Sequence, residues 1–172
     1  MDGSFGACQR WPGLEASGAS IAFGVAVGRV RVRSDAAVAV VDLTARVERF
    51  VARAALRDGW VNVQTRHTTT GVCVNENEPL LVGDLLALLE RLAPRSAIAY
   101  AHDELHRRPD VPPDERPNGH AHAKALLLRT AETLNVADGR LQLGRWQRVL
   151  LLDLDGPRER EVSLLGMGER RQ

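Results

Sequence analysis

The chain of 172 residues has a mass of 18.8 kDa, which fits one ordinary domain rather than two large ones. Its 23 basic and 22 acidic side chains nearly cancel, which argues against a nucleic-acid or membrane-surface partner, because such partners need a clustered positive face. Two cysteines exclude a disulfide-rich scaffold, no apolar run is long enough to cross a bilayer, and no secretory leader is recognisable, so we expect a cytoplasmic protein.

The first third of the chain predicts a tail, two strands and a helix. Residues 1–20 are rich in Gly, Ser and Ala without a sustained period, so we expect a flexible N-terminal tail. Apolar residues alternate over 21–32, which predicts a strand or a bent hairpin, and run together over 38–41, which predicts a second short strand. Apolar residues three and four apart then indicate a helix, with Thr44 as its N-cap and Asp58-Gly59 as its end.

The middle of the chain predicts strands over 60–66 and 72–75, followed by a leucine-rich helix. Pro79 is suited to the first turn of that helix, and Pro94 ends it. The stretch 102–119 holds four prolines among charged residues, so we expect a loop there. A loop of this length in a small domain is usually functional or disordered.

The last third predicts a helix over 121–130 with Asn118 as N-cap, then a hairpin that turns at Asp138-Gly139. The run 146–154 is apolar almost throughout, which is typical of a strand in the centre of a sheet, and 161–165 closes the fold. Strands that arrive mostly as hairpins favour an α+β domain with antiparallel sheet.

Polar side chains that can carry chemistry cluster in three segments. All five histidines lie in the middle of the chain: His67, His102, His106, His120 and His122. We expect His67, His102 and His122 to converge on a divalent metal, with Asp103 or Glu76 as an oxygen ligand or orienting group. The hydroxyls of Thr68, Thr69 and Thr70, together with helix N-terminal amides near Gly119, are suited to a phosphate or carboxylate.

Ordinary structural roles compete with these interpretations. An isolated loop histidine is usually a solvated polar residue, which we favour for His106 and leave open for His120. On a helix, His120 and His122 would point apart, so they are poor co-ligands if the helix has already begun. Glu76 is either a general base or part of a capping segment before the next helix. Trp146 either lines a pocket or belongs to the core.

Four motifs together resemble one known family. They are His67–Gly71 with Asn75 and Glu76, Tyr100–Asp103, Asn118–His122, and Gly139–Gln147. Their order and spacing are similar to those of the YjbQ family, also called UPF0047 or the secondary thiamine-phosphate synthase family. The resemblance covers residues 22–162, so we expect one YjbQ-like domain over 21–166 and a C-terminal tail over 167–172.

The resemblance implies a fold, an assembly and an activity. The fold is an α+β sandwich of mainly antiparallel sheet with two or three packed helices, assembled as a homotrimer with the histidine pocket near a subunit boundary. The activity is a weak thiamine-phosphate synthase reaction, which joins an aminopyrimidine diphosphate to a thiazole phosphate and releases pyrophosphate. The family's polar motif positions fall on His67, Asn75, Glu76, His102, Asp103 and His122. His120 departs from the pattern, because many members have Pro there.

Two hypotheses of function follow. In the first, the protein is a metal-assisted enzyme acting on a small phosphorylated molecule. Glu76, Asp103 and His67 are then catalytic, and His67, His102 and His122 bind the metal. The substrate contacts are Thr68, Thr69, Thr70, Asn75, Asn118 and Trp146. In the second, the same cluster is a non-catalytic metal or anion site in a small trimeric binding protein.

The identity of the metal does not match the expected reaction. A histidine-rich set favours zinc, whereas magnesium, the usual partner of pyrophosphate, prefers carboxylates and water. This mismatch suggests that the synthase activity is incidental and that the physiological substrate is another phosphorylated or anionic small molecule.

Overall fold

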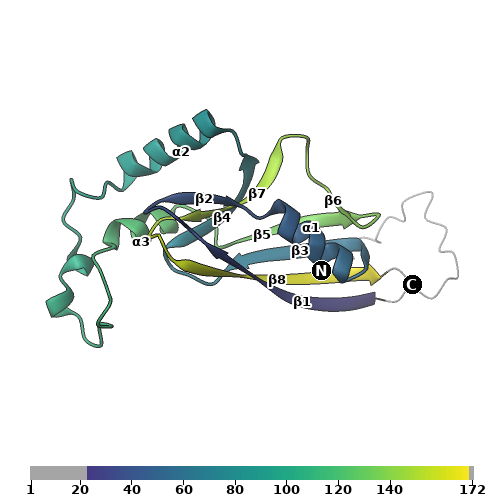
Figure 1. Cartoon of the computed structure of the whole chain (residues 1–172), viewed down its shortest axis with the longest axis horizontal. Coiled ribbons are helices and arrows are strands. Elements are labelled where there is room, and N and C mark those ends of the chain that lie inside the picture. The colour runs from purple at the N-terminus through teal and green to yellow at the C-terminus, as the bar shows by residue number, and fades with distance from the viewer. Residues whose placement is uncertain (1–22, 171–172) are drawn as a thin grey trace, which may run out of the picture.

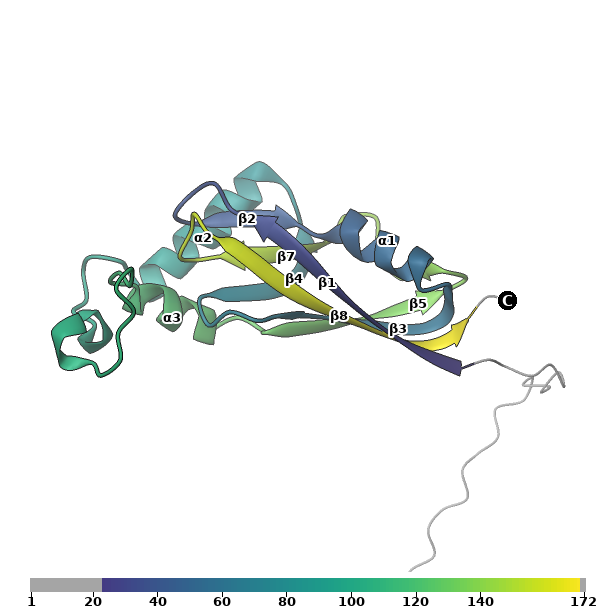
Figure 2. The same ribbon diagram turned by 60° about the horizontal axis from the view of Figure 1, so that its bottom comes forward.

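Residues 23–170 are described by a computed structural model, shown in Figures 1 and 2. The strands are β1 (Phe23–Arg33), β2 (Ala39–Asp42), β3 (Leu56–Thr65), β4 (Thr70–Glu76), β5 (Ala131–Ala137), β6 (Arg140–Leu141), β7 (Gln147–Asp153) and β8 (Glu159–Arg170). The helices are α1 (Thr44–Arg53), α2 (Pro79–Leu92) and α3 (Gly119–Leu126), with the 3-10 turns η1 (Ala101–Asp103) and η2 (Leu105–Arg107) between α2 and α3. The tail predicted over residues 1–20 lies outside the described residues.

Two antiparallel sheets form the body of the molecule. The larger has the strand order β1-β8-β3-β5-β6, and the smaller has the order β2-β7-β4. Every strand pair in both sheets is antiparallel, which confirms the α+β prediction. The main core lies between the sheets and includes Val61 and Val162 of the larger sheet, Val72 of the smaller one and Val47 of α1.

Strand β7 is buried on both faces. Val149 and Leu151 join the main core, whereas Leu150 and Leu152 on the opposite face pack in a second cluster with residues of α2 and α3. Because successive strand residues point to opposite faces, a strand covered on both sides must be apolar throughout. The prediction of a central strand is confirmed, and α2 and α3 form a third layer beyond the smaller sheet (Figure 1).

Helix α1 begins differently from the prediction. Leu43 occupies the N-cap position, and Thr44 is the first helical residue. The Thr44 hydroxyl accepts the backbone N–H of Val149 at 2.9 Å, so it ties the helix to β7 instead of capping the helix. Asp42 supplies the capping oxygen, because its Oδ1 accepts the N–H of Thr44 at 2.8 Å.

The end of α1 was also predicted wrongly. The chain reverses at Ala55, which has a left-handed φ of 51°, and β3 begins at the next residue. Gly59 therefore lies inside β3, opposite Gly168 of β8. A Cβ atom at Gly59 would come within 2.1 Å of the carbonyl oxygen of Met167, so this glycine permits close strand approach rather than ending a helix.

Two more boundaries differ from the sequence prediction. Strand β8 continues to Arg170 and pairs Glu169 with Phe23, so residues 167–170 belong to the sheet and not to a tail. Helix α3 ends at Leu126, because the chain must turn before β5 begins at Ala131. Within residues 23–170, none of the helices has the length and hydrophobicity needed to span a bilayer.

A buried ion pair joins the two sheets at one end. Nε and Nη2 of Arg160 in β8 donate to the two carboxylate oxygens of Asp153 in β7, at 2.9 and 2.6 Å. The Ser34 hydroxyl donates to the same carboxylate at 2.6 Å. Burial alone would raise the pKa of Asp153, but the hydrogen bonds from Arg160, Ser34 and the Asp155 backbone outweigh burial and lower it. Asp153 is therefore charged and held between the sheets.

We predict that Arg160→Met lowers the free energy of unfolding by about 3–5 kcal/mol, because it leaves the buried Asp153 carboxylate without its partner. Urea denaturation measures this loss. The control is Arg107→Met, which breaks the exposed pair with Glu104 and should cost less than about 1 kcal/mol. Equal losses in the two variants would contradict the assigned role of the buried pair.

Candidate functional site

A polar cavity of about 360 Å³ lies at the end of the sandwich that holds the Asp153–Arg160 pair. Five segments surround it: the turn between β3 and β4, η1, the proline-rich loop, the start of α3, and the turn between β7 and β8. The proline-rich loop projects beside α3 in both views (Figures 1 and 2). Its lining residues are Arg66, His67, Thr68, Thr69, His102, Arg108, Glu115, Asn118, His122, Asp155, Arg158 and Arg160. Three sequence segments thus bring His67, His102 and His122 to one cavity, as their motifs predicted.

His102 and His122 form the closest pair of rings in the cavity. Their centroids lie 4.7 Å apart in an edge-to-face arrangement, although one ring belongs to η1 and the other to α3. Burial and the neighbouring His102 lower the pKa of His122, so its ring is neutral at pH 7.

Asp103 holds these two segments together. Its Oδ1 accepts the backbone N–H of Gly119, the first residue of α3, at 2.7 Å. A carboxylate at a helix N-terminus satisfies an otherwise unpaired N–H group and interacts favourably with the helix dipole. Asp103 therefore positions α3 and does not line the cavity, and the Gly119 amide predicted to bind an anion is already occupied.

His67 has a fixed hydrogen-bonding role. Its Nε2 accepts the backbone N–H of Glu161 in β8 at 2.8 Å. A neutral imidazole that accepts at Nε2 carries its proton on Nδ1 and can donate only from there. Burial and the nearby Arg160 lower the pKa of His67, which keeps the ring in this neutral form.

The arrangement does not fit the three-histidine metal site predicted from the sequence. A metal-bound histidine needs a ring nitrogen with a free lone pair, and the lone pair of His67 at Nε2 is already used. Among the residues that the structure describes, no group of three His, Cys, Asp or Glu side chains is placed to hold an ion. His102 and His122 lie together, and residues 23–170 offer them no third ligand of these types.

The predicted threonine contacts divide into two kinds. Thr68 and Thr69 line the cavity. Thr70 is buried, shares a hydrogen bond with the Thr65 hydroxyl and donates to the carbonyl of His67 at 3.2 Å, so it braces the turn that carries His67. Thr70 thus has a structural role in this turn.

Asn118 lines the cavity and is 4% exposed. Its Nδ2 donates to Glu115 at 3.2 Å and to Asp155 at 3.1 Å, which fixes the orientation of the amide. These bonds connect the proline-rich loop to the turn after β7, so Asn118 fixes the position of both carboxylates in the cavity wall.

Three other predicted site residues lie at the opposite end of the smaller sheet. Asn75 and Glu76 end β4, and Glu76 pairs with Gln147, six residues along the strand from Thr70. At about 3.3 Å per residue this places them roughly 20 Å from the histidine cavity. Trp146 is 59% exposed there and contacts the guanidinium of Arg145. In this chain these three residues are not part of the histidine cavity.

The segment before α2 does cap that helix, but the capping residue is Glu78 and not Glu76. The side chain of Glu78 accepts the backbone N–H groups of Leu80 and Leu81 at 2.9 and 2.8 Å. Pro79 is the first residue of α2, as predicted.

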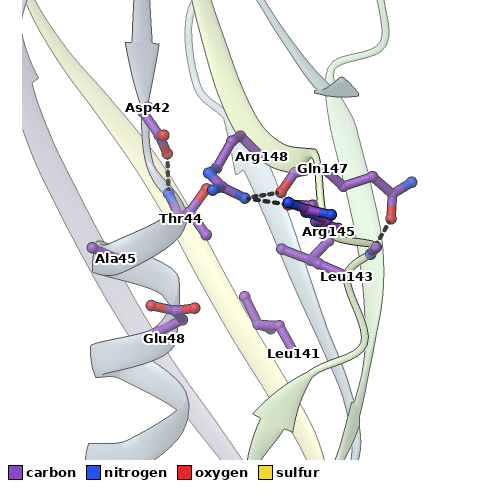
Figure 3. Close-up of a pocket in the computed structure, with 10 residues that line it drawn as sticks. Asp42, Thr44, Ala45, Glu48, Leu141, Leu143, Arg145, Gln147 and Arg148 are labelled. Carbon is purple, nitrogen blue, oxygen red and sulfur yellow. Dashed lines mark hydrogen bonds between the residues drawn. The ribbon is translucent and has the colours of Figure 1, made fainter. Parts of the chain in front are cut away.

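A larger cavity of about 630 Å³ lies between α1 and the segment from β6 to β7, as Figure 3 shows. Its polar groups hold the local backbone. Asp42 accepts the N–H of Thr44, Gln147 accepts the N–H of Gly144 at 2.8 Å, and Arg148 donates to the carbonyl of Gln147 at 2.8 Å. This cavity contains no histidine, and we consider the smaller histidine cavity the candidate functional site because its side chains carry the acid–base and anion-binding groups.

A family profile described as UPF0047 protein YjbQ-like matches residues 28–169. The chain belongs to the YjbQ family. A UPF0047 protein of Archaeoglobus fulgidus is 42% identical over 125 residues, which are 73% of this chain and 88% of that protein. The UPF0047 protein YugU of Bacillus subtilis is 31% identical over 130 residues, 75% of this chain and 89% of its own length.

Two solved structures share the fold. A YbjQ-like protein of Sulfolobus solfataricus has a TM-score of 0.76 at 28% identity and covers 86% of this chain and 100% of its own. A hypothetical protein of Aeropyrum pernix has a TM-score of 0.74 at 33% identity, covering 84% of this chain and 99% of its own. These matches confirm the YjbQ-like α+β sandwich predicted from the four motifs.

Helix α3 of this YjbQ-family chain separates two environments. His122 lines the candidate site, whereas His120 is buried on another face, near Lys124 and in a separate small cavity. The two rings point apart, as expected for residues two apart on a helix. The sequence left the role of His120 open, and the structure places His120 outside the candidate site.

Sequence reasoning missed six of the polar residues in the lining. They are Arg66, Arg108, Glu115, Asp155, Arg158 and Arg160. Single arginines next to motifs look like solvated surface residues, and only the packing of distant segments around the cavity shows which of them face it. Arg66 directly precedes the His67 motif and Glu115 lies in the proline-rich loop, so nearness to motifs was the one available signal.

We predict that the protein loses stability as the pH falls from about 6.5 toward 5. The pKa values of His67 and His122 are lower in the folded protein than the usual 6.5 of an unfolded chain, so the unfolded state takes up protons first. Urea denaturation across this pH range gives the free energy of unfolding at each pH. This free energy should fall less steeply with decreasing pH for His122→Gln than for the wild type. The exposed-loop control His106→Gln should keep the wild-type slope, and equal slopes in all three proteins would contradict the prediction.

Proposed function

We propose that the histidine cavity binds the phosphate group of a small molecule and that the protein is an enzyme acting on that molecule. The observation that carries this proposal is the composition of the wall, which holds four arginines, three histidines and only two carboxylates. Three of these arginines already pair with carboxylates: Arg66 with Glu161, Arg158 with Asp155 and Arg160 with Asp153. Among the described residues Arg108 has no ion pair, so its charge is the one most available to an anion. Arginine is the side chain best suited to phosphate oxygens, because its guanidinium donates in a planar fork.

His67 adds a directional donor to this charge. Because its Nε2 is bound to the Glu161 amide, the ring offers Nδ1–H as its available donor. A phosphate oxygen accepts from such a group without requiring a change of protonation. The hydroxyls of Thr68 and Thr69 lie in the same wall and extend the donor set.

The His102–His122 pair supplies the acid–base chemistry in this proposal. Burial and the neighbouring His102 lower the pKa of His122, so its neutral ring is able to accept a proton from a bound substrate. The arginines then stabilise the negative charge that develops on a phosphate or pyrophosphate leaving group. The proposal assigns this charge neutralisation to side chains of the chain and routes no step through a metal ion.

The family resemblance offers one reaction to assay. In thiamine-phosphate synthesis the thiazole nitrogen forms a bond to the methylene carbon of the aminopyrimidine diphosphate. The carbon–oxygen bond to the diphosphate breaks, and its electron pair leaves with pyrophosphate. Electropositive walls favour that departure.

We predict that pyrophosphate binds to the purified protein in isothermal titration calorimetry and that Arg108→Gln weakens binding about tenfold. Arg108 lines the site and donates weakly to the carbonyl of His102 at 3.5 Å, so its guanidinium is available to a ligand. The matched control is Arg145→Gln in the other cavity, which should bind as the wild type does. Undetectable pyrophosphate binding, or equal losses in both variants, would overturn the anion site.

We predict that His122→Ala abolishes release of pyrophosphate from the synthase substrates, while His106→Ala retains it. A coupled pyrophosphate assay at high enzyme concentration measures this. Turnover by His122→Ala at the wild-type rate would refute the assigned acid–base role. Tight anion binding without turnover of any phosphorylated substrate would instead favour a non-catalytic binding protein.

We also propose that the protein assembles as a homotrimer, as the resemblance implies. The outer face of the larger sheet supports this, because Phe23, Val25 and Val27 on β1 are exposed there. The register places Val25 beside Met167 and Val27 beside Leu165 on the same face. An exposed apolar face of this kind is typical of a protein–protein interface.

A trimer would also explain why the motif residues lie at two separate ends of the smaller sheet. Asn75, Glu76 and Trp146 stand among the family's motif segments but lie at the end of the sheet away from the histidines. A site near a subunit boundary would let these residues of one copy approach the histidine cavity of another.

We predict a mass near three times 18.8 kDa in size-exclusion chromatography with light scattering. Val27→Glu should shift the protein toward the monomer, because Val27 is 73% exposed and a charge there disfavours burial in an interface. Asp35→Glu, at an exposed turn, is the control. A monomeric wild type at all concentrations would contradict the assembly.

A further inference from the structure

The candidate site differs from ordinary ligand pockets in what its wall lacks. Small-molecule pockets are usually lined mainly by aliphatic and aromatic side chains, with a few polar groups that fix orientation. Among the described residues that line this cavity, none is aliphatic or an aromatic hydrocarbon. Every lining side chain carries a hydrogen-bonding or charged group.

Such a wall binds a flat heterocyclic or hydrocarbon ring poorly, so we expect only weak turnover of the synthase substrates, which carry such rings. A ring face placed on guanidinium and carboxylate groups removes water from them and returns few hydrogen bonds. Leaving a buried polar group unpaired costs about 1–3 kcal/mol, and more for a charged group. The rings of His102 and His122 contact each other edge to face, which leaves less of their surface for stacking on a ligand ring.

The wall also contains hydrogen-bond acceptors, which a phosphate does not need. Oε1 of Glu115 accepts the backbone N–H of Arg116 and the amide of Asn118, both at 3.2 Å. Its Oε2 has no hydrogen bond to the described residues. A carboxylate oxygen in this position repels a phosphate and attracts a hydroxyl donor.

We infer that the ligand of this site is a phosphorylated polyol, the chemical class of sugar phosphates and sugar-alcohol phosphates. This inference rests on the proposed function, because it takes Arg108 and His67 as the phosphate contacts. The hydroxyl groups donate to Oε2 of Glu115 and accept from the hydroxyls of Thr68 and Thr69. A cavity of about 360 Å³ lies within the range of small-ligand sites, about 300–1,000 Å³.

Isothermal titration calorimetry with ligands of matched phosphate charge tests the inference on the full chain. The probes are inorganic phosphate, phenyl phosphate and three polyol phosphates of increasing size: glycerol 3-phosphate, ribose 5-phosphate and glucose 6-phosphate. At least one polyol phosphate should bind about tenfold more tightly than phenyl phosphate, the equivalent of about 1.4 kcal/mol. A buried charged hydrogen bond accounts for a difference of that size.

Glu115→Gln provides the residue-level test. It keeps the side-chain shape and one acceptor oxygen but replaces the other oxygen with a donor, so the ratio between polyol phosphate and phenyl phosphate should fall to about threefold or less. The loss of a negative charge acts on all phosphates alike and cancels in this ratio. Glu104→Gln, which lies outside the cavity and pairs with Arg107, should leave the ratio unchanged.

Two results would overturn the inference alone, and a third would overturn the proposed function together with it. Phenyl phosphate binding as tightly as every polyol phosphate, or a ratio that Glu115→Gln does not move, refutes the polyol class while inorganic phosphate binding still upholds the anion site. Absence of binding by inorganic phosphate as well as by all the esters refutes the proposed function, and the inference falls with it.

Discussion

The buried pair of Asp153 and Arg160 is the interaction on which the site depends. Asp153 ends the central strand of the smaller sheet, where it pairs across both Ala39 and Thr70, and Arg160 belongs to the larger sheet. A charged pair with almost no solvent exposure permits little relative movement, because each hydrogen bond between the groups would be lost without compensation by water. The two sheets are thus fixed at the end where the polar cavity opens.

The same pair sets the surroundings of the histidines. Arg160 also donates to the carbonyl of Asp155 at 3.0 Å, and Asp155 accepts from Arg116 and Asn118 at 3.0 and 3.1 Å. The Asn118 bonds reach the start of α3, which places His122, and the next residue along β8 fixes the His67 ring. The cavity therefore combines the guanidinium of Arg108 with a neutral His67 ring, whose orientation a backbone hydrogen bond sets, and with the neutral ring of His122. That combination suits a polar anion better than a metal ion.

Much of the fold was predictable because its signals are local. The alternation of β1, the leucines and proline of α2 and the turn at Asp138-Gly139 each depend on a few neighbouring residues. The predicted boundaries of helices and strands were wrong where tertiary contacts decide them. Ala55, not the glycine at position 59, ends α1, and the glycine is needed for contact with β8.

The site was predictable only in part for the same reason. The motifs identified three histidines that do meet, because each motif marks a segment where the chain reverses or begins a helix. Side-chain roles depend on partners far along the chain. The backbone N–H of Glu161 donates to the Nε2 atom of His67, and the backbone N–H of Gly119 donates to the carboxylate of Asp103. Asn75, Glu76 and Trp146 belong to the same motifs, but the length of β4 separates them from the histidines.

The central claim is that the ring of His67 is a fixed neutral donor to an anion rather than a metal ligand. Long-range nitrogen–proton NMR of the imidazole side chains, recorded near pH 7.5 with and without phosphate, tests it most directly. The account predicts that His67 carries its proton on Nδ1, that the Nδ1 signal shifts when phosphate is added, and that zinc leaves it unchanged. A proton on Nε2, or a zinc-induced shift at either nitrogen of His67, would contradict the account.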